Sequence, residues 1–211
     1  IPADVKTVIR IDNDGVIESL DAPVTDKAYR PVVVGNAVQS VTDGTSADLD
    51  GATLWDGQLL KQPSLEDGIY QVGTAAELAW IADGINQGTL ERADVRLTDD
   101  IDLNDREWSP MGNDAHPFAG SFDGQGHTIH NLQIFEGAQW SGVFGTVSGA
   151  VIRNVILDSA HLKNVGSESA ALVGRSMGCT LENCRVLDSI VAADEGAASV
   201  GGLVGRVESG A

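Results

Sequence analysis

Acidic side chains are the groups in this sequence best suited to catalysis, because paired carboxyl groups can act as acid, base or nucleophile. A glycoside hydrolase needs two of them about 5 to 9 Å apart over one groove. The C-terminal carboxylates are scattered over expected loops without a fixed place in any pattern: Asp158, Glu168, Glu182, Asp188, Asp194 and Glu195. A lyase would need a basic residue beside an acidic calcium cluster, and basic residues are few. We therefore expect no enzymatic activity, and a polysaccharide-active enzyme remains an alternative.

The spacing of histidines and aspartates gives little support for a bound metal. His127 and His130 are three residues apart on an expected strand, so they face opposite sides. Asp100 and Asp102 lie about 7 Å apart on one strand face, and could hold calcium only with help from a neighbouring strand. A solvated acidic face is the alternative. The Asp12–Asp14 cluster lacks the later ligand of a calcium loop and is interpreted as a turn. No metal and no cofactor are expected.

The charge of the chain excludes some partners. The formal charge is −18, from 13 basic and 31 acidic residues, which repels nucleic acid phosphates and anionic membrane surfaces. No apolar run approaches the roughly 18 residues of a membrane-spanning helix. Because no signal peptide precedes Ile1, we interpret the chain as a mature or excised fragment. We expect the rest of its own longer chain to continue beyond Ala211.

A five-residue phrase with a central polar residue and an asparagine recurs in the C-terminal half. It appears as Thr128–Leu132, Val151–Val155 and Thr180–Cys184. Its asparagines are Asn131, Asn154 and Asn183, which are 23 and 29 residues apart (154 − 131 and 183 − 154). Its apolar positions are Ile129, Ile152 and Leu181, followed three residues later by Leu132, Val155 and Cys184. We expect each of these two sets to stack inside successive coils.

A second phrase, rich in glycine, alternates with the first. Its copies end in Gly145, Gly174 and Gly205, which are 29 and 31 residues apart (174 − 145 and 205 − 174). Self-similarity at this period is typical of a solenoid. The units lack helical spacing, so each is expected to form one coil of a parallel β-helix, with asparagine at the point where the chain changes direction. The alternative is three unrelated asparagines in polar loops.

These phrases resemble the GLUG repeat of large secreted and wall-attached bacterial proteins, including adhesins and the non-catalytic part of IgA proteases. The resemblance extends upstream through Trp108–Gly112 and Phe118–Ile129, and covers roughly residues 52–211. It implies a mainly β fold, a parallel β-helix, with an extracellular or cell wall-attached location. It does not specify a ligand.

The N-terminal part of the chain is expected to be a separate unit. We divide the chain into 1–50, a small β region and linker, and 51–211, the capped β-helix. In the first part, Val5–Ile11, the Asp12–Gly15 turn and Val16–Ile17 predict a hairpin. In the second, Thr74 and Glu77 predict the start of a helix, which we expect to form an N-terminal helical cap over the coil. Cys179 and Cys184 flank one expected strand, too far apart for a disulfide unless the chain turns between them.

Taken together, these patterns favour a non-catalytic adhesin or interaction module of a larger bacterial protein. A non-catalytic β-helix of a large secreted protease is the alternative. The expected partner is a host glycan or protein. Trp140, in the loop 136–140, is the candidate ligand-binding residue, because loops on rigid scaffolds carry recognition and tryptophan can stack on a sugar ring. The other possibility is that Trp140 packs back over the edge of the coil.

Overall fold

The chain divides into two units, residues 1–56 and 57–211. The computed structural model describes residues 10–13, 32–35, 55–135, 139–193 and 199–208. In the first unit, β1 (Arg10–Asn13) pairs in parallel with β2 (Val32–Gly35). Asp12 and Asn13 therefore lie in a strand, and their prediction as a hairpin turn is wrong. The expected hairpin strands at 5–9 and 16–17 lie outside the described residues.

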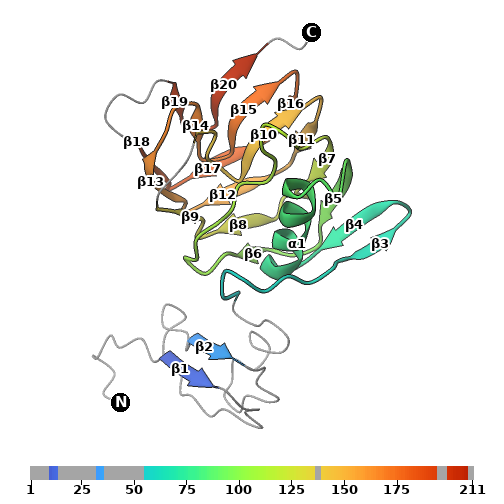
Figure 1. Ribbon diagram of the computed structural model, residues 1–211, viewed down its shortest axis with the longest axis vertical. Coiled ribbons are helices and arrows are strands. Elements are labelled where there is room, and N and C mark those ends of the chain that lie inside the picture. The colour runs from blue at the N-terminus through green and yellow to red at the C-terminus, as the bar shows by residue number, and fades with distance from the viewer. Residues whose placement is uncertain (1–9, 14–31, 36–54, 136–138, 194–198, 209–211) are drawn as a thin grey trace. The chain divides into compact units, whose positions relative to one another are not determined.

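The second unit is a parallel β-solenoid of about four coils, in which one coil is a full circuit of the chain (Figure 1). Its first side holds β3 (Ser64–Glu66), β4 (Ile69–Val72), β5 (Ala93–Leu97), β7 (Gly120–Asp123), β11 (Val151–Arg153) and β16 (Thr180–Glu182). The second side holds β6 (Ile101–Asp102), β8 (Thr128–His130), β12 (Ile156–Asp158) and β17 (Arg185–Leu187). Among the strands of the described residues, β3 alone pairs in an antiparallel manner, with β4.

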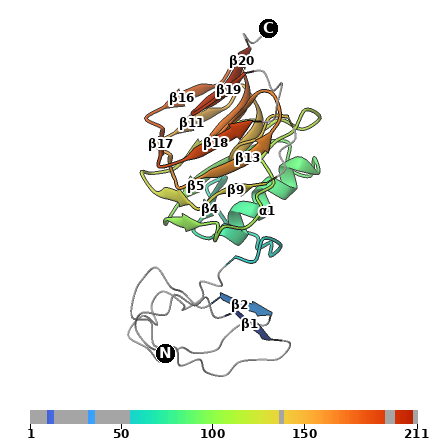
Figure 2. The same ribbon diagram turned by 90° about the vertical axis from the view of Figure 1, so that its left-hand side faces the viewer.

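The chain continues around two further sides in each coil (Figure 2). The third side holds β9 (Gln133–Ile134), β13 (His161–Val165) and β18 (Ile190–Ala193). The fourth side begins with the short strands β14 (Ser169–Ala170) and β19 (Val200–Gly201). It ends with β10 (Phe144–Ser148), β15 (Val173–Met177) and β20 (Val204–Glu208). The four sides enclose a core of stacked apolar residues, including a tilted and an edge-on contact of Phe144 with Phe118 and Phe122.

Residues in the left-handed conformation mark all four corners of the last two coils. In the third and fourth coils they are Gly149, Asn154, Ser159 and Glu168, then Gly178, Asn183, Asp188 and Ser199. Glycine, asparagine and aspartate reach this conformation at low cost, which explains why they recur there. Asn154 and Asn183 occupy the same corner, because the Asn154 N–H donates to the carbonyl oxygen of the residue before Asn183.

The predicted stacking of the asparagine phrase is correct for the copies at 151–155 and 180–184 and wrong for the copy at 128–132. Ile152 pairs with Phe122 and Leu181, as one column of the first side. Ile129 pairs instead with Leu157 on the second side. Ile129 and Ile152 are both fully buried, whereas Leu181, in the last coil, is half-buried.

Asn131 and Leu132 follow the same correction. Asn131 lies one corner further along the coil than Asn154 and Asn183, level with Ser159. Leu132 is level with Ala160 and not with Val155, which shares its place with Cys184. The physical reason is that two successive corners require the same left-handed backbone. Asparagine followed by an apolar residue suits both corners, so the phrase cannot distinguish them.

The glycine-rich phrase, by contrast, has the predicted register. Gly145, Gly174 and Gly205 lie level with one another on the fourth side. A Cβ on Gly174 would lie 2.4 Å from the carbonyl carbon of Trp140, and one on Gly205 would lie 2.6 Å from that of Glu168. Each glycine therefore packs against the backbone of a corner in the preceding coil. Glycine recurs here because any larger residue would separate the coils.

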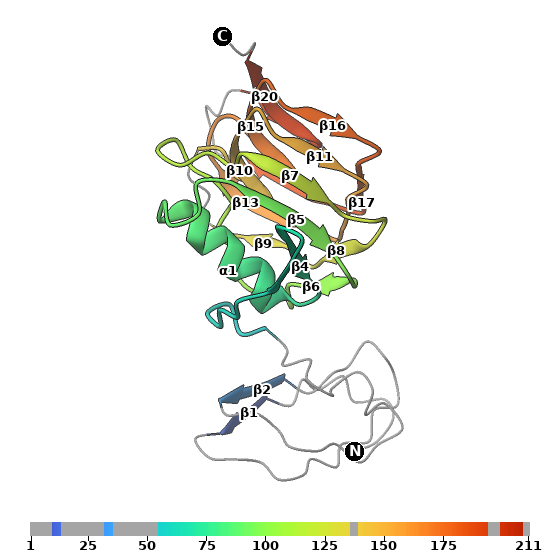
Figure 3. The same ribbon diagram turned by 90° about the vertical axis from the view of Figure 1, so that its right-hand side faces the viewer.

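One 12-residue helix, α1 (Ala75–Asn86), precedes the first complete coil (Figure 3). Thr74 caps it as predicted, because its side-chain oxygen accepts the Glu77 N–H at 3.3 Å. The Asn86 side chain, at the other end, accepts the Gly112 N–H at 2.9 Å and donates to the Pro110 carbonyl at 3.0 Å. A single short helix does not support the expected helical cap. Through Asn86, α1 instead holds the segment around Gly112 in place.

A polar ladder joins the coils at the first corner. The Asn154 side chain donates to Asp123 at 2.9 Å, and the Asn183 side chain donates to Asn154 at 2.9 Å. Arg153 adds an ion pair to Asp123 at 2.8 Å. Burial alone would raise the pKa of Asp123, but hydrogen bonds from Asn154, the Gln125 N–H and Arg153 outweigh it, so the pKa lies below its ordinary value.

The interior column predicts the cost of an Ile152→Ala substitution. Ile152 is fully buried between Phe122 and Leu181, so truncation leaves a cavity and should lower the free energy of unfolding by about 2 to 5 kcal/mol. Denaturant unfolding measures this loss. The control is Val151→Ala, because the neighbouring Val151 side chain is 39% exposed and should lose about 0.5 kcal/mol. Equal losses in the two variants would contradict the register.

The glycine column predicts that Gly174→Ala is severely destabilising. The added methyl group would overlap the Trp140 backbone, so we expect a loss of about 3 kcal/mol in the free energy of unfolding. Gly202→Ala is the matched control. No atom of the described residues lies within 4 Å of a Cβ at Gly202, and Ala171 already occupies the level position in the preceding coil. A Gly174→Ala protein as stable as the control would show that the coils do not approach this closely.

The lowered pKa of Asp123 predicts a pH-dependent contribution to stability. Its folded pKa lies below the unfolded value of about 3.9. The stabilisation is therefore complete above pH 4 and is lost as the pH falls through the folded pKa. Asp123→Asn should lower the free energy of unfolding by about 1 kcal/mol at pH 7, and by less at pH 3. The exposed Asp83→Asn controls for loss of charge, and a pH-independent difference would argue against this role.

Candidate functional site

The third corner of the coil carries the candidate residue Trp140. Trp140 and Glu168 lie level with each other, since the Trp140 N–H donates to the Ser167 carbonyl oxygen at 3.3 Å. Ser199 follows in the next coil, level with Glu168. The three residues have φ values of 64°, 62° and 62°. They form the column of left-handed residues between the third and fourth sides.

Tryptophan and glutamate are unexpected in this conformation. The left-handed region costs an ordinary L-residue about 1 to 2 kcal/mol, and a bulky side chain is rarely found there. Glycine or asparagine, which occupy other corners, would avoid most of that cost. A residue kept against its backbone preference is often kept for its side chain. This makes the side chains of Trp140 and Glu168 the first candidates for function.

The spacing of the inward-facing residues also distinguishes the third corner. In the third and fourth coils, successive inward residues on the first three sides are five apart: Ile152 to Leu157 to Leu162, and Leu181 to Val186 to Val191. In the first and second coils the first corner takes six and seven residues, from Val95 to Ile101 and from Phe122 to Ile129. Across the third corner the separations are 10, 11 and 13: Ile134 to Phe144, Leu162 to Val173, and Val191 to Val204. The third corner therefore has longer connections than the first and second corners of the same coils, and loops on rigid scaffolds are where recognition is carried.

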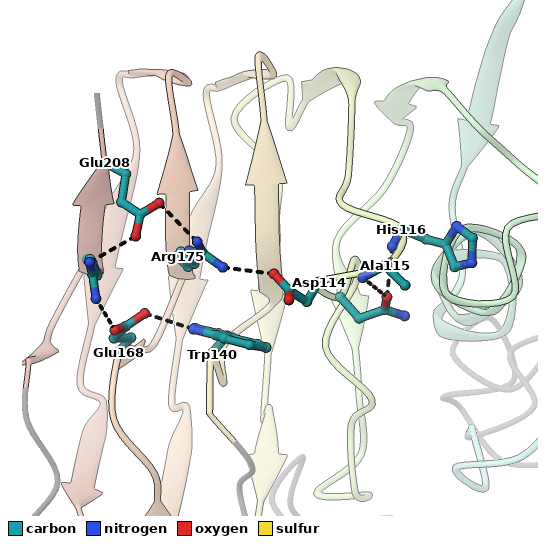
Figure 4. Close-up of polar contacts among 9 residues, drawn as sticks. Asp114, Ala115, His116, Trp140, Glu168, Arg175 and Glu208 are labelled. Atoms are coloured by element: carbon teal, nitrogen blue, oxygen red, sulfur yellow. Dashed lines mark hydrogen bonds and ion pairs between the residues drawn. The ribbon is translucent and has the colours of Figure 1, made fainter. Parts of the chain in front are cut away.

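The indole of Trp140 is half-buried and held in one orientation. Its Nε1–H donates to Oε2 of Glu168 at 2.8 Å (Figure 4). The guanidinium carbon of Arg175 lies 5.4 Å from the ring centroid, within the range of a cation–π interaction. The ring thus packs against its own chain, as the alternative interpretation of the sequence expected. Part of its surface nevertheless remains open to solvent.

Two arginines and three carboxylates surround the ring. Arg175 forms ion pairs with Asp114 at 2.8 Å and Glu208 at 2.9 Å. Arg206, level with Arg175 in the next coil, binds Glu208 at 3.0 Å and also Glu168. We call these six residues the Trp140 cluster: Asp114, Trp140, Glu168, Arg175, Arg206 and Glu208. They come from four consecutive coils.

Asp114 reaches this cluster because its loop is anchored to α1. The Asn113 side chain donates to the Asn86 carbonyl oxygen at 3.1 Å, and its own oxygen accepts the backbone N–H groups of Ala115 and His116 at 3.0 and 2.9 Å. Asp114 is therefore presented from a compact loop towards a residue 61 positions later in the chain. This long separation explains why local sequence patterns did not indicate it.

Contacts within the cluster favour the charged forms of Glu168 and Arg175. Burial would raise the pKa of Glu168, but hydrogen bonds from Trp140 and Arg206 lower it below the ordinary value. The hydrogen bond to Glu208 raises the pKa of Arg175, against the effect of its burial. The cluster therefore contains two positive and three negative groups that hold one another in place. A carboxyl group with a lowered pKa is unsuited to act as a general acid at neutral pH.

Arg175 and Arg206 were missed in the sequence, although a signal was present. Each follows the last glycine of a repeat, in Leu172–Arg175 and Leu203–Arg206, where both segments read Leu-Val-Gly-Arg. A repeated charged residue next to a structural glycine indicates a column of charge on one side of a solenoid. The spacing of the glycine phrase alone could therefore have identified Arg175 and Arg206 as members of the cluster, in addition to Trp140.

Four of the remaining candidate residues form two separate His–Asp pairs. His127 Nδ1 lies 3.3 Å from Asp100, and His130 Nδ1 lies 3.4 Å from Asp158. Among the described residues, no group of three or more His, Cys, Asp or Glu side chains could hold a metal ion. Cys179 and Cys184 are free thiols. Asp194, Glu195 and the loop residues 136–138 lie outside the described part of the chain.

In the described part of the chain, no helix has the length and apolar character required to cross a membrane. The sequence matches no protein-family model. It also matches no solved structure. Over an alignment of 153 positions, which covers 66% of this chain, the sequence is 34% identical to halomucin of Haloquadratum walsbyi. The alignment spans only 2% of the length of halomucin, so the similarity relates this solenoid to a small part of a much larger protein.

Proposed function

We propose that this chain is a non-catalytic interaction module of a larger extracellular or cell wall-attached protein, in which the solenoid is a rigid scaffold for a ligand-binding surface. The observation that carries the proposal is the Trp140 cluster. Its six side chains are ordered by contacts across four coils while the interior remains apolar. Ordering before binding reduces the entropy lost when a ligand is bound.

Two further observations support this function. The similarity to halomucin covers a small fraction of a very long protein, as expected of one module among many. The glycine column, with its spacing of 29 and 31 residues, is compatible with membership of the GLUG-repeat proteins, which we include in the proposal. A surface location and a role in adhesion follow from that membership.

The proposed absence of catalysis is supported by the state of the carboxyl groups. Asp100, Asp123 and Glu168 all have pKa values below their ordinary range. Asp100 is lowered chiefly by the Thr128 N–H, while for Asp123 and Glu168 hydrogen bonds outweigh burial. Glycoside hydrolysis needs at least one carboxyl group with a raised pKa, to protonate the leaving group. These three groups are shifted in the opposite direction.

The proposal predicts binding without turnover. The full chain, immobilised at one end, should retain a glycan or an extracellular protein from defined panels, while polysaccharide and peptide substrates incubated with it stay intact by mass spectrometry. The control is the chain unfolded in urea, which should retain neither. Cleavage of a substrate that is abolished by a single change such as Glu168→Gln would show that the module is an enzyme. Failure to retain any panel member would contradict its role as a binding module.

A further inference from the structure

We infer that the Trp140 cluster binds a neutral sugar ring of a glycan, with Trp140 as the stacking platform and Asp114 and Arg206 as specificity-determining residues. This inference rests on the proposed function of the chain as a binding module. It adds the chemical class of the ligand and the residues that select it. The argument proceeds from the exposure of each group, then from the charge of the cluster.

Exposure separates the groups that hold the cluster from those that face solvent. The side chains of Arg175 and Glu168 are only 19% and 16% exposed, and both are engaged with Trp140. Those of Asp114 and Arg206 are 64% and 48% exposed. The first pair therefore fixes the indole, and the second pair remains accessible beside it. The surface offers an aromatic ring flanked by an exposed acceptor and an exposed donor.

This arrangement matches the two surfaces of a sugar. A pyranose has a C–H face that packs on an aromatic ring and hydroxyl groups around its edge. Each hydroxyl both donates and accepts, so it can bind the Asp114 carboxylate and the Arg206 guanidinium. A protein interface of standard size needs a dry apolar centre with few charges. One half-buried indole among five charged side chains does not provide such a centre.

Charge decides between neutral and acidic sugars. The cluster has three carboxylates and two guanidinium groups, and each guanidinium is already engaged by two carboxylates. The whole chain adds a formal charge of −18. A uronate or another carboxylated sugar would meet net repulsion, because the carboxylates of the cluster already neutralise the charge of both arginines. A neutral hexose meets no such repulsion.

Affinity electrophoresis of the full chain tests this inference. Gels would contain a neutral glucan, mannan or galactan, with hyaluronate and alginate as acidic comparators. The wild type should be retarded by at least one neutral polysaccharide and by neither acidic one. Trp140→Asn should weaken that binding at least tenfold, because it removes the platform while asparagine accepts the left-handed backbone. Asp114→Asn should change the preference among the neutral polysaccharides.

Matched variants separate binding from folding. Phe135→Ser removes another exposed aromatic residue, outside the cluster, and should bind as the wild type does. If Trp140→Asn fails to fold, Trp140→Phe is the substitute variant. It keeps an aromatic ring but loses the Nε1–H donor, so it should retain part of the wild-type affinity for the neutral polysaccharide. Unchanged binding by a folded Trp140→Asn variant would overturn the inference, and so would retardation of the wild type by the acidic polysaccharides alone. Either result would still be compatible with the proposed function of the chain as a binding module. Retention of no glycan and no protein by the wild type would overturn both proposals.

Discussion

Close approach of successive coils is the constraint on which this structure depends. Parallel strands pair about 4.8 Å apart, so a coil can follow its neighbour only where nothing projects between their backbones. At the fourth side the corner of one coil lies directly against the strand of the next, and Gly174 has no room there for a Cβ. That contact sets the register of the fourth side. It thereby determines that Arg175 and Arg206 lie level, beside Trp140.

The two repeated phrases differ in what could be predicted from them because they answer different physical demands. The glycine phrase satisfies a steric requirement that occurs once per coil, so its spacing predicted the register of Gly145, Gly174 and Gly205 correctly. The asparagine phrase satisfies a conformational requirement shared by neighbouring corners. Asn131 and Asn154 meet it equally well, so spacing could not show that they belong to different columns. The pairing of Ile129 with Leu157 became evident only from the strands.

At the candidate site, too, sequence patterns predict local features but not the contacts between distant segments. Trp140 could be identified as an aromatic residue in a loop, but its orientation depends on Glu168 and Arg175, each supplied by another coil. Asp114 depends on a loop held by Asn86 at the end of α1. Local patterns predicted the helix without indicating that its last residue anchors this loop. Contacts of this kind arise from packing between segments far apart in the chain.

The unequal spacing around the coil has a consequence for how such proteins diversify. Between the second and third sides of the last three coils, inward residues are always five apart, and a one-residue insertion within these strands would turn inward residues outward because the pleat alternates. At the third corner, separations of 10, 11 and 13 residues are all compatible with the same columns on either side. Gain or loss of residues there leaves the core intact. The surface around Trp140 can therefore change in length without disturbing the scaffold beneath it.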